Sequence, residues 1–121
     1  MRNYRDLMVW QKSMAFVTDI YKSTAAFPKS ESLGLALQLR RCTVSIPSNI
    51  AEGYGRNSTA DYVRFLKVAM GSLYEAQTQL EIALNLGYII NDDYDTLYET
   101  SREIERMLSS LISKIKQKQQ A

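Results

Sequence analysis

The sequence predicts an all-α protein, an antiparallel up-down-up-down four-helix bundle formed as a single domain by residues 1–121. Three observations support this fold class. Apolar residues recur every three or four positions along four long stretches, which is the spacing of an amphipathic helix. The whole chain contains only two prolines and five glycines, so long uninterrupted helices are favoured. The connections between the four stretches are short, so consecutive helices must lie antiparallel.

The first helix is predicted over residues 6–26. Asp6 is a candidate cap for its free backbone N–H groups, and the Phe27-Pro28 step ends it because the residue before a proline avoids helical geometry. Positions spaced by three and four residues are expected to face the core, with Trp10 as an anchor: Leu7, Trp10, Met14, Val17, Tyr21 and Thr24.

The second helix is predicted over residues 31–53, with Ser30 or Ser32 as its cap. It contains the least ordinary stretch of the chain, ten uncharged residues between Arg41 and Glu52 that include Pro47. Apolar residues lie on two faces, so we expect this helix to be the most buried of the four. The first face consists of Leu35, Leu39, Cys42, Ile46 and Ile50, and the second of Leu37, Val44 and Ala51.

Within this stretch, a proline in a helix interior removes one backbone hydrogen bond and bends the helix. We therefore expect a kink at Pro47, with Ser45 or Ser48 hydrogen-bonded to the disturbed backbone. Alternation over residues 43–46 also fits a short strand, but the sequence offers it no partner strand. The residues assigned a structural role in this motif are Ser45, Pro47, Ser48, Asn49, Glu52 and Gly53.

The third and fourth helices are predicted over residues 58–86 and 91–117. Ser58, followed three residues later by Asp61, is typical of a helix N-terminus, and Gly87 is a typical C-terminal stop. The core-facing positions of the third helix include three alanines spaced by seven, which allow close approach of a neighbouring helix. They are Tyr62, Leu66, Ala69, Leu73, Ala76, Leu80 and Ala83; those of the fourth helix are Tyr94, Leu97, Ser101, Ile104, Leu108, Leu111 and Ile115.

The composition excludes several kinds of chemistry. The chain has no histidine and one cysteine, which removes Ser-His and Cys-His nucleophile pairs and a zinc site. We therefore expect no enzymatic activity, no cofactor and no metal. No uncharged run exceeds ten residues, well short of a membrane span, and a lone cysteine suits a reducing compartment. A cytoplasmic protein without a membrane partner is expected.

The net charge of +2 is unevenly distributed along the chain. Residues 1–57 carry eight Lys/Arg and four Asp/Glu, whereas residues 58–121 carry seven and nine. The candidate phosphate-binding residues are Arg40, Arg41, Arg56, Arg64 and Lys67. Ion pairing of these cations with Glu52, Glu75 or Glu81 is the preferred interpretation, and phosphate contact is the alternative. The Gly53-Tyr54-Gly55 segment is a weaker candidate for anion binding.

Apolar residues outside the core-facing positions predict self-association. They exceed what the interior of one bundle requires and would leave exposed patches that a second copy could cover. These residues are Val9, Phe16, Val63, Phe65, Met70, Tyr74 and Tyr98. The sequence therefore predicts a homo-oligomer.

Four segments carry a resemblance to a known family. They are Asp6-Leu7-x-Val9-Trp10-Gln11-Lys12, the motif Arg40-Arg41-x-x-Val44-Ser45-Ile46-Pro47-Ser48-Asn49-Ile50-Ala51-Glu52-Gly53, Phe65-Leu66-x-x-Ala69-x-Gly71-Ser72-Leu73-x-Glu75, and Leu86-Gly87-Tyr88. Together these residues resemble the four-helix-bundle proteins encoded in 23S rRNA intervening sequences, over nearly the whole chain.

The resemblance implies a left-handed antiparallel bundle that forms a homopentamer and has no enzymatic activity. One branch is similar to the accessory variability determinant of diversity-generating retroelements, which implies nucleic acid and a reverse transcriptase, or another protein, as partners. The leading hypothesis is a non-enzymatic oligomer that binds RNA or DNA through a basic surface. The alternative is a protein-interaction scaffold or accessory factor without nucleic-acid affinity.

Overall fold

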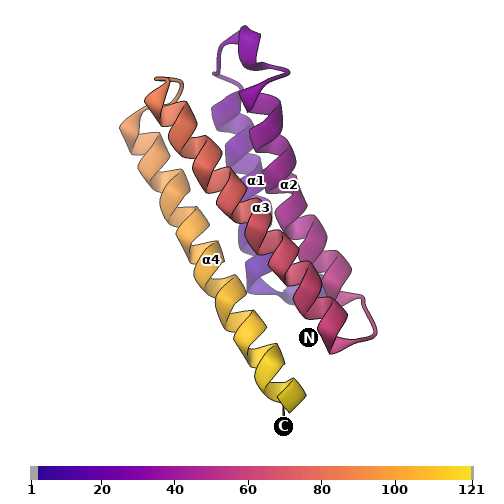
Figure 1. Ribbon diagram of the computed structural model, residues 1–121. Coiled ribbons are helices and arrows are strands. Elements are labelled where there is room, and N and C mark those ends of the chain that lie inside the picture. The colour runs from indigo at the N-terminus through magenta and orange to yellow at the C-terminus, as the bar shows by residue number, and fades with distance from the viewer. Residues whose placement is uncertain (1–2, 121) are drawn as a thin grey trace.

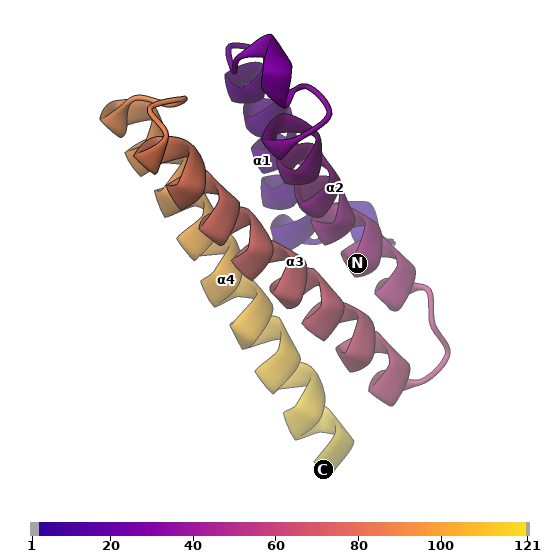
Figure 2. The same cartoon turned by 45° about the horizontal axis from the view of Figure 1, so that its top comes forward.

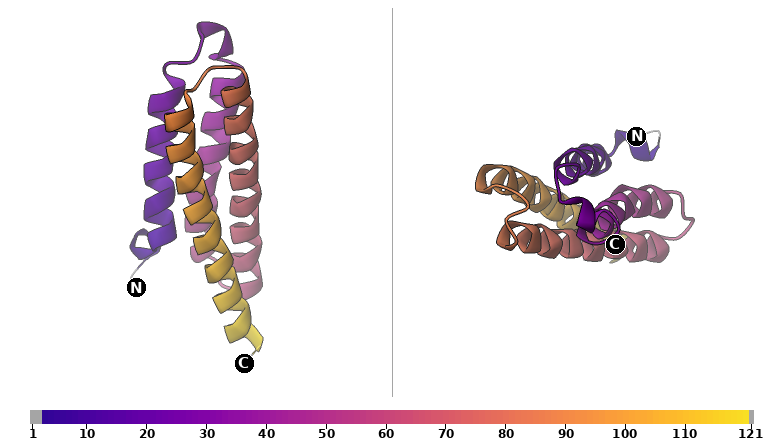
Figure 3. Two further views of the ribbon diagram at one scale, coloured as in Figure 1. Left: turned by 90° about the vertical axis from the view of Figure 1, so that its left-hand side faces the viewer. Right: turned by 90° about the horizontal axis from the view of Figure 1, so that it is seen from above.

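The computed structural model describes residues 3–120 and confirms an all-α four-helix fold. The four helices are α1 (Met8–Thr24), α2 (Leu35–Tyr54), α3 (Thr59–Asn85) and α4 (Asn91–Gln120), with short 3₁₀ helices at Tyr4–Asp6 and Lys29–Glu31. Consecutive helices run antiparallel (Figure 1). The start of α1, the α2–α3 turn and the end of α4 therefore lie at one end of the bundle (Figure 3). Among the described residues, no helix is long and apolar enough to cross a membrane.

The closest helix pair is α2 and α3, which lie side by side along much of their length (Figures 1 and 2). Each contributes small residues to the contact, and the Oγ atoms of Ser45 and Ser72 are 2.8 Å apart. At Gly53 a Cβ atom would lie 2.7 Å from the Cβ of Phe65. Gly53 is thus a helical residue that permits this approach, and not part of a turn or an anion-binding loop as the sequence suggested.

The predicted core-facing side of the first helix is wrong by about one residue from Trp10 to Tyr21, whereas Leu7 and Thr24 are buried as predicted. The buried residues of α1 are Val9, Ser13, Phe16, Ile20 and Thr24. Met14 and Tyr21 are 42% and 44% exposed, and Trp10 is half-buried against the ring of Tyr4. Ser13 can be buried because its Oγ donates to the Val9 carbonyl at 2.7 Å. Such a bond satisfies the hydroxyl that made this face look polar in the sequence.

Both of the first two helices begin later than predicted. Asp6 ends a 3₁₀ turn, and extended Leu7 separates that turn from α1 at Met8. Gly34, not a serine, is the N-cap residue of α2, and Glu31 Oε1 accepts from the first helical N–H, that of Leu35, at 3.0 Å. The Glu31 Oε2 accepts from the Tyr88 hydroxyl at 2.9 Å, which joins the α1–α2 connection to the α3–α4 connection.

Five of the ten residues of the uncharged stretch of α2 are buried, and the helix continues through Pro47. The predicted second apolar face does not lie in the core, because Leu37 and Ala51 are half-buried and Val44 is 39% exposed. Eight of the 20 residues of α2 are buried, against seven of 27 in α3, which confirms α2 as the more buried of the two. Ser48 Oγ donates to the Val44 carbonyl at 2.8 Å, and Asn49 Nδ2 donates to the Ser45 carbonyl at 2.7 Å. The polar residues of the motif therefore serve the helix backbone and the α2–α3 contact.

The predicted ends of α3 are confirmed. Ser58 Oγ accepts from the Asp61 N–H at 3.0 Å. Gly87 has a φ of +75°, and the N–H of Tyr88 donates to the Ala83 carbonyl at 2.9 Å. This pattern is the Schellman motif that ends many helices. The core-facing positions from Leu66 to Ala83 are also buried as predicted, and Leu97, Ser101, Ile104 and Leu108 are buried on α4.

The expectation of exposed patches needs correction. Val9, Phe16 and Val63 are buried at 4%, 0% and 8% exposure, so they belong to the interior of this chain. Tyr74 is exposed at 49% as expected, while Phe65, Met70 and Tyr98 are half-buried. Other large apolar residues of α1, α2 and α3 are exposed instead, so they are the candidates for a contact with a second copy. They include Met14, Val44, Val68 and Ile82.

Gly53→Ala is expected to destabilise the protein by about 1–3 kcal/mol, because the added methyl group would overpack the α2–α3 contact. Gly71→Ala is the matched control, since it is also helical and a Cβ there meets no atom within 4 Å. It should stabilise the protein by about 1 kcal/mol through helix propensity. Urea unfolding followed by circular dichroism measures both; equal effects of the two changes would contradict the close approach at Gly53.

Tyr88→Phe is expected to lower the melting temperature by a few degrees at neutral pH. The Leu35 N–H and the Tyr88 hydroxyl lower the pKa of Glu31 below 4.5. A depressed carboxyl pKa stabilises the fold above 4.5, and this contribution is lost as the pH falls through the lower folded value. The difference between wild type and variant should therefore shrink in acid. Tyr74→Phe, at an exposed tyrosine, should show no such pH-dependent difference in thermal unfolding.

Candidate nucleic-acid interface

Basic residues gather at the end of the bundle where α2 ends, α3 begins and α4 ends. Arg56 follows the last turn of α2, and Arg64 and Lys67 lie in the first turns of α3. Beyond Glu105, α4 carries Arg106, Lys114, Lys116 and Lys118 and no acid in the described residues. Three elements thus contribute cations to the same end, which we call the basic end: Arg56, Arg64, Lys67, Lys114, Lys116 and Lys118.

Two arginines of the basic end share one aromatic ring. The guanidinium carbons of Arg56 and Arg64 each lie 4.7 Å from the centroid of Phe65. Each arginine also has an acid neighbour: Arg56 Nη2 is 2.9 Å from Glu52 Oε1, and Arg64 Nη2 is 3.5 Å from Asp61 Oδ1. These acids are themselves 56% and 47% exposed. Stacking orients the guanidinium groups while leaving their edges open to further hydrogen bonds.

Arg40 has a structural role away from the basic end. Its Nε donates to Thr24 Oγ1 at 2.8 Å and its Nη2 to the Tyr21 carbonyl at 3.3 Å. The guanidinium also lies 4.6 Å from the centroid of the Tyr21 ring. A cation at the last turn of a helix interacts favourably with the helix dipole. Arg40 therefore ties α2 to the C-terminal end of α1, a partner that was not among the predicted acids.

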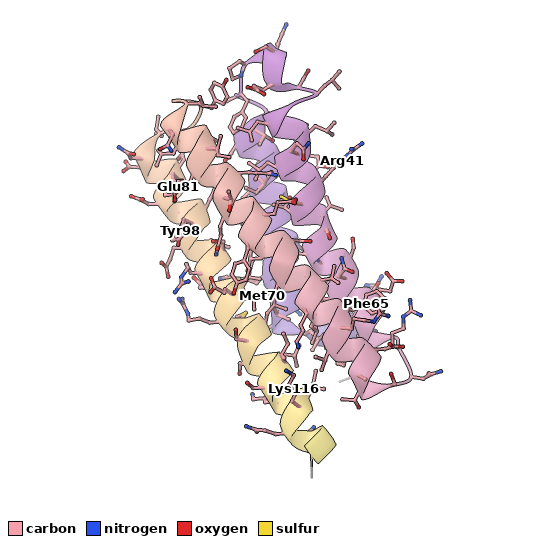
Figure 4. The ribbon with its side chains drawn as sticks, viewed as in Figure 1. Arg41, Phe65, Met70, Glu81, Tyr98 and Lys116 are labelled. Carbon is pink, nitrogen blue, oxygen red and sulfur yellow. The ribbon has the colours of Figure 1, made fainter. Side chains whose placement is uncertain are left out.

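Arg41 is exposed but lies apart from the basic end. Figure 4 shows it on the half of α2 farther from Phe65 and Lys116. Of the five residues proposed from the sequence, the structure groups Arg56, Arg64 and Lys67, and leaves Arg40 and Arg41 elsewhere. The preferred ion-pair interpretation is correct for Arg56, which pairs with Glu52.

The net charge is separated between the ends of the bundle. At the opposite end, around the α3–α4 connection, acids outnumber cations such as Lys22 and Lys29; the acids of α3 and α4 there are Glu81, Asp92, Asp93, Asp95 and Glu99. The charge imbalance between residues 1–57 and 58–121 does not correspond to the two ends of the bundle, because antiparallel helices bring segments of both halves to each end. A chain of net charge +2 thus presents a basic surface where an anion would be attracted.

The lysines of α4 were not among the candidates from the sequence, since lysines in the last turns of a helix are already accounted for by the helix dipole. The sequence did contain one signal for them, since Lys114, Lys116 and Lys118 occupy alternate positions after Glu105, the last acid. Which cations of α3 they accompany depends on how α3 and α4 align. That alignment is fixed by contacts such as Gln77 Nε2 to Ser101 Oγ and to Glu105 Oε1, both at 3.1 Å.

Other chemical sites are not formed by the described residues. No group of three or more His, Cys, Asp or Glu side chains there could hold a metal ion. Cys42 Sγ donates to the Leu39 carbonyl at 3.3 Å and lies 3.5 Å from Gln79 Oε1. Burial raises the pKa of Cys42 to about 12, so its thiol is protonated and a poor nucleophile at neutral pH.

Comparison with known families identifies the chain. The family model described as 23S rRNA-intervening sequence protein matches residues 5–110. The chain belongs to this family. The match spans the motif in α2, the Ser45–Ser72 contact and most of α4, so the residues that define the packing lie inside it. No protein of curated function matches the chain.

One solved structure supports the family fold. It is the crystal structure of a protein of unknown function from the S23 ribosomal protein family of Bacteroides thetaiotaomicron. The two chains are 29% identical, and the match covers 87% of this chain and 98% of the other, with a TM-score of 0.79. The four-helix arrangement is thus similar to that of an experimentally determined structure.

Proposed function

We propose that this 23S rRNA-intervening sequence protein is a non-enzymatic, self-associating bundle that binds RNA or DNA through its basic end. The observation that carries the proposal is the convergence of six exposed cations from three elements, with Arg56 and Arg64 stacked on Phe65. Guanidinium groups suit phosphate oxygens because they donate paired hydrogen bonds. Structured RNA is the first probe, because the family takes its name from an rRNA intervening sequence. A reverse transcriptase or another protein remains a proposed further partner.

Self-association is supported by a groove between α1 and α2. The groove has a volume of about 380 Å³ and is lined by Tyr4, Trp10, Met14, Val17, Val44, Pro47, Ser48 and Ala51. We propose that a second copy occupies it, since α3 presents complementary apolar side chains in Val68 and Ile82, 46% and 42% exposed. A groove on one copy and a ridge on the next form a head-to-tail contact, which gives a ring where the rotation between copies closes. The family resemblance favours five subunits.

Removal of Arg56 and Arg64 is expected to weaken nucleic-acid binding and its salt dependence. In a fluorescence-anisotropy titration with a structured RNA and a single-stranded DNA, wild-type affinity should fall steeply with salt. Each lost phosphate contact should reduce the log–log slope by roughly 0.7 to 0.9. Arg56→Gln with Arg64→Gln should flatten the slope accordingly. Arg41→Gln, an exposed arginine of α2 outside the basic end, is the matched control. Absence of binding at low salt would leave the alternative, a scaffold without nucleic-acid affinity.

Val44→Lys is expected to disrupt self-association without unfolding the chain, because Val44 is 39% exposed on the edge of the groove. Light scattering after size exclusion at low micromolar concentration should give an oligomer for the wild type and smaller species for the variant. Leu33→Lys is the control, since Leu33 is 85% exposed in the α1–α2 connection. A monomeric wild type would refute self-association, and an unchanged Val44→Lys oligomer would refute this groove as the contact.

A further inference from the structure

A groove opens at each end of the seam between α1 and α4, which is the loosest of the neighbouring helix pairs in the described residues. The two helices run beside each other along one side of the bundle (Figure 3). The groove where α1 begins has a volume of about 420 Å³, and the groove where α4 begins has a volume of about 560 Å³. Lys12 Nζ and Glu103 Oε2, 2.8 Å apart, bridge the seam between the grooves. We call this side of the bundle the α1–α4 face.

The two grooves carry opposite charge. Arg106 and Lys114 line the groove at the start of α1, and none of the residues described there is acidic. Asp19 and Asp93 line the groove at the start of α4, with Lys22 as the one cation described there. All five of these side chains are exposed. We call the first the basic groove and the second the acidic groove.

Each groove also has a large apolar side chain that is exposed to solvent. Met8, in the basic groove, is 70% exposed, and Ile90, in the acidic groove, is 66% exposed. Such side chains beside an apolar hollow are typical of a surface that another protein covers. Each groove therefore offers both a hollow and an apolar side chain that fits the hollow of an opposite groove.

We propose that the α1–α4 face binds the same face of a second copy, with the two chains antiparallel. A two-fold axis through the middle of the face places the basic groove of each copy against the acidic groove of the other. The spacing of the grooves matches because both copies have the same spacing. Ile90 enters the basic groove of the other copy, Met8 enters its acidic groove, and Asp93 meets Arg106 or Lys114. A parallel arrangement would oppose like charges instead.

The centre of the face permits close approach of two copies. Ala15 is exposed and shares its side of α1 with Lys12 at i−3 and Asp19 at i+4. It lies seven residues after Met8 and seven before Lys22, so the axis passes near this small side chain. A surface two helices wide, about 20 Å, and as long as α1, about 26 Å, covers roughly 500 Å² before the relief of the side chains is added. With that relief it approaches the ~600 Å² per partner at which stable interfaces begin.

The first test uses chains that carry Val44→Lys, so that the proposed contact at the groove between α1 and α2 is absent. Sedimentation equilibrium should show a concentration-dependent dimer that weakens with salt, because the charged pairs lie at the groove rims. Asp19→Lys with Asp93→Lys, and separately Arg106→Glu with Lys114→Glu, should each raise the dimer dissociation constant by about a hundredfold. A one-to-one mixture of these two chains should restore the dimer, because every groove then faces opposite charge again.

Arg41→Glu with Glu75→Lys is the matched control for the charge reversals. Both residues are exposed and neither lines the basic or the acidic groove, so this chain should dimerise as before. Circular dichroism checks that each variant is folded. A Val44→Lys chain that is monomeric at every concentration, or a mixture of folded variants that stays monomeric, would overturn the proposal. Since the α1–α4 face shares only Lys114 with the basic end, either result would leave the proposed nucleic-acid binding intact.

The second test distinguishes an antiparallel contact from a head-to-tail contact. A two-fold axis brings a residue near the axis close to its own copy, whereas a head-to-tail contact does not. A short bismaleimide should therefore link Ala15→Cys chains into covalent dimers. Met14→Cys is the matched control, because Met14 is exposed on the side of α1 that lines the other groove, and Cys42 is buried. A dimer in which Ala15→Cys links no better than Met14→Cys would overturn the antiparallel contact.

Discussion

The close approach of α2 and α3 is the constraint on which the rest of this structure depends. It requires a residue without a side chain at Gly53, where the Phe65 Cβ leaves no room for another methyl group. The same contact fixes where Phe65 lies, and therefore where Arg56 and Arg64 can stack. Core packing and the candidate interface are thus coupled: the glycine that allows the helices to meet also positions the ring that orients two surface cations.

Much of the fold could be predicted from the sequence, and the failures have identifiable causes. In α3 the spacing of leucines and alanines is compatible with only one core-facing side, so the predicted core residues of this helix were correct. In α1, apolar neighbours such as Phe16 and Val17 fit two sides with the same period. The choice between them depends on the partner helices and on Ser13, whose hydroxyl is satisfied by its own helix. Periodicity alone contains neither piece of information.

The candidate site was less predictable than the fold. The sequence identified cations, but a long cationic side chain takes its partner from tertiary structure. Arg40 was expected to pair with an acid, yet its guanidinium lies on a tyrosine ring and bonds to the end of α1. Lys12 lies 91 residues from its partner Glu103 along the chain, and only the packing of α1 against α4 brings them together. Such proximity cannot be deduced from spacing within one helix.

The excess of acids at one end and of cations at the other gives the molecule an electric dipole along its long axis. An approaching polyanion would turn the bundle before contact, so that the basic end arrives first. The proposed ring has a further consequence. If the bundles lie along the axis of a ring, all the dipoles point the same way and the ring acquires one basic and one acidic face. Several weak phosphate sites would then act on one strand together, and avidity would replace high affinity at any single site.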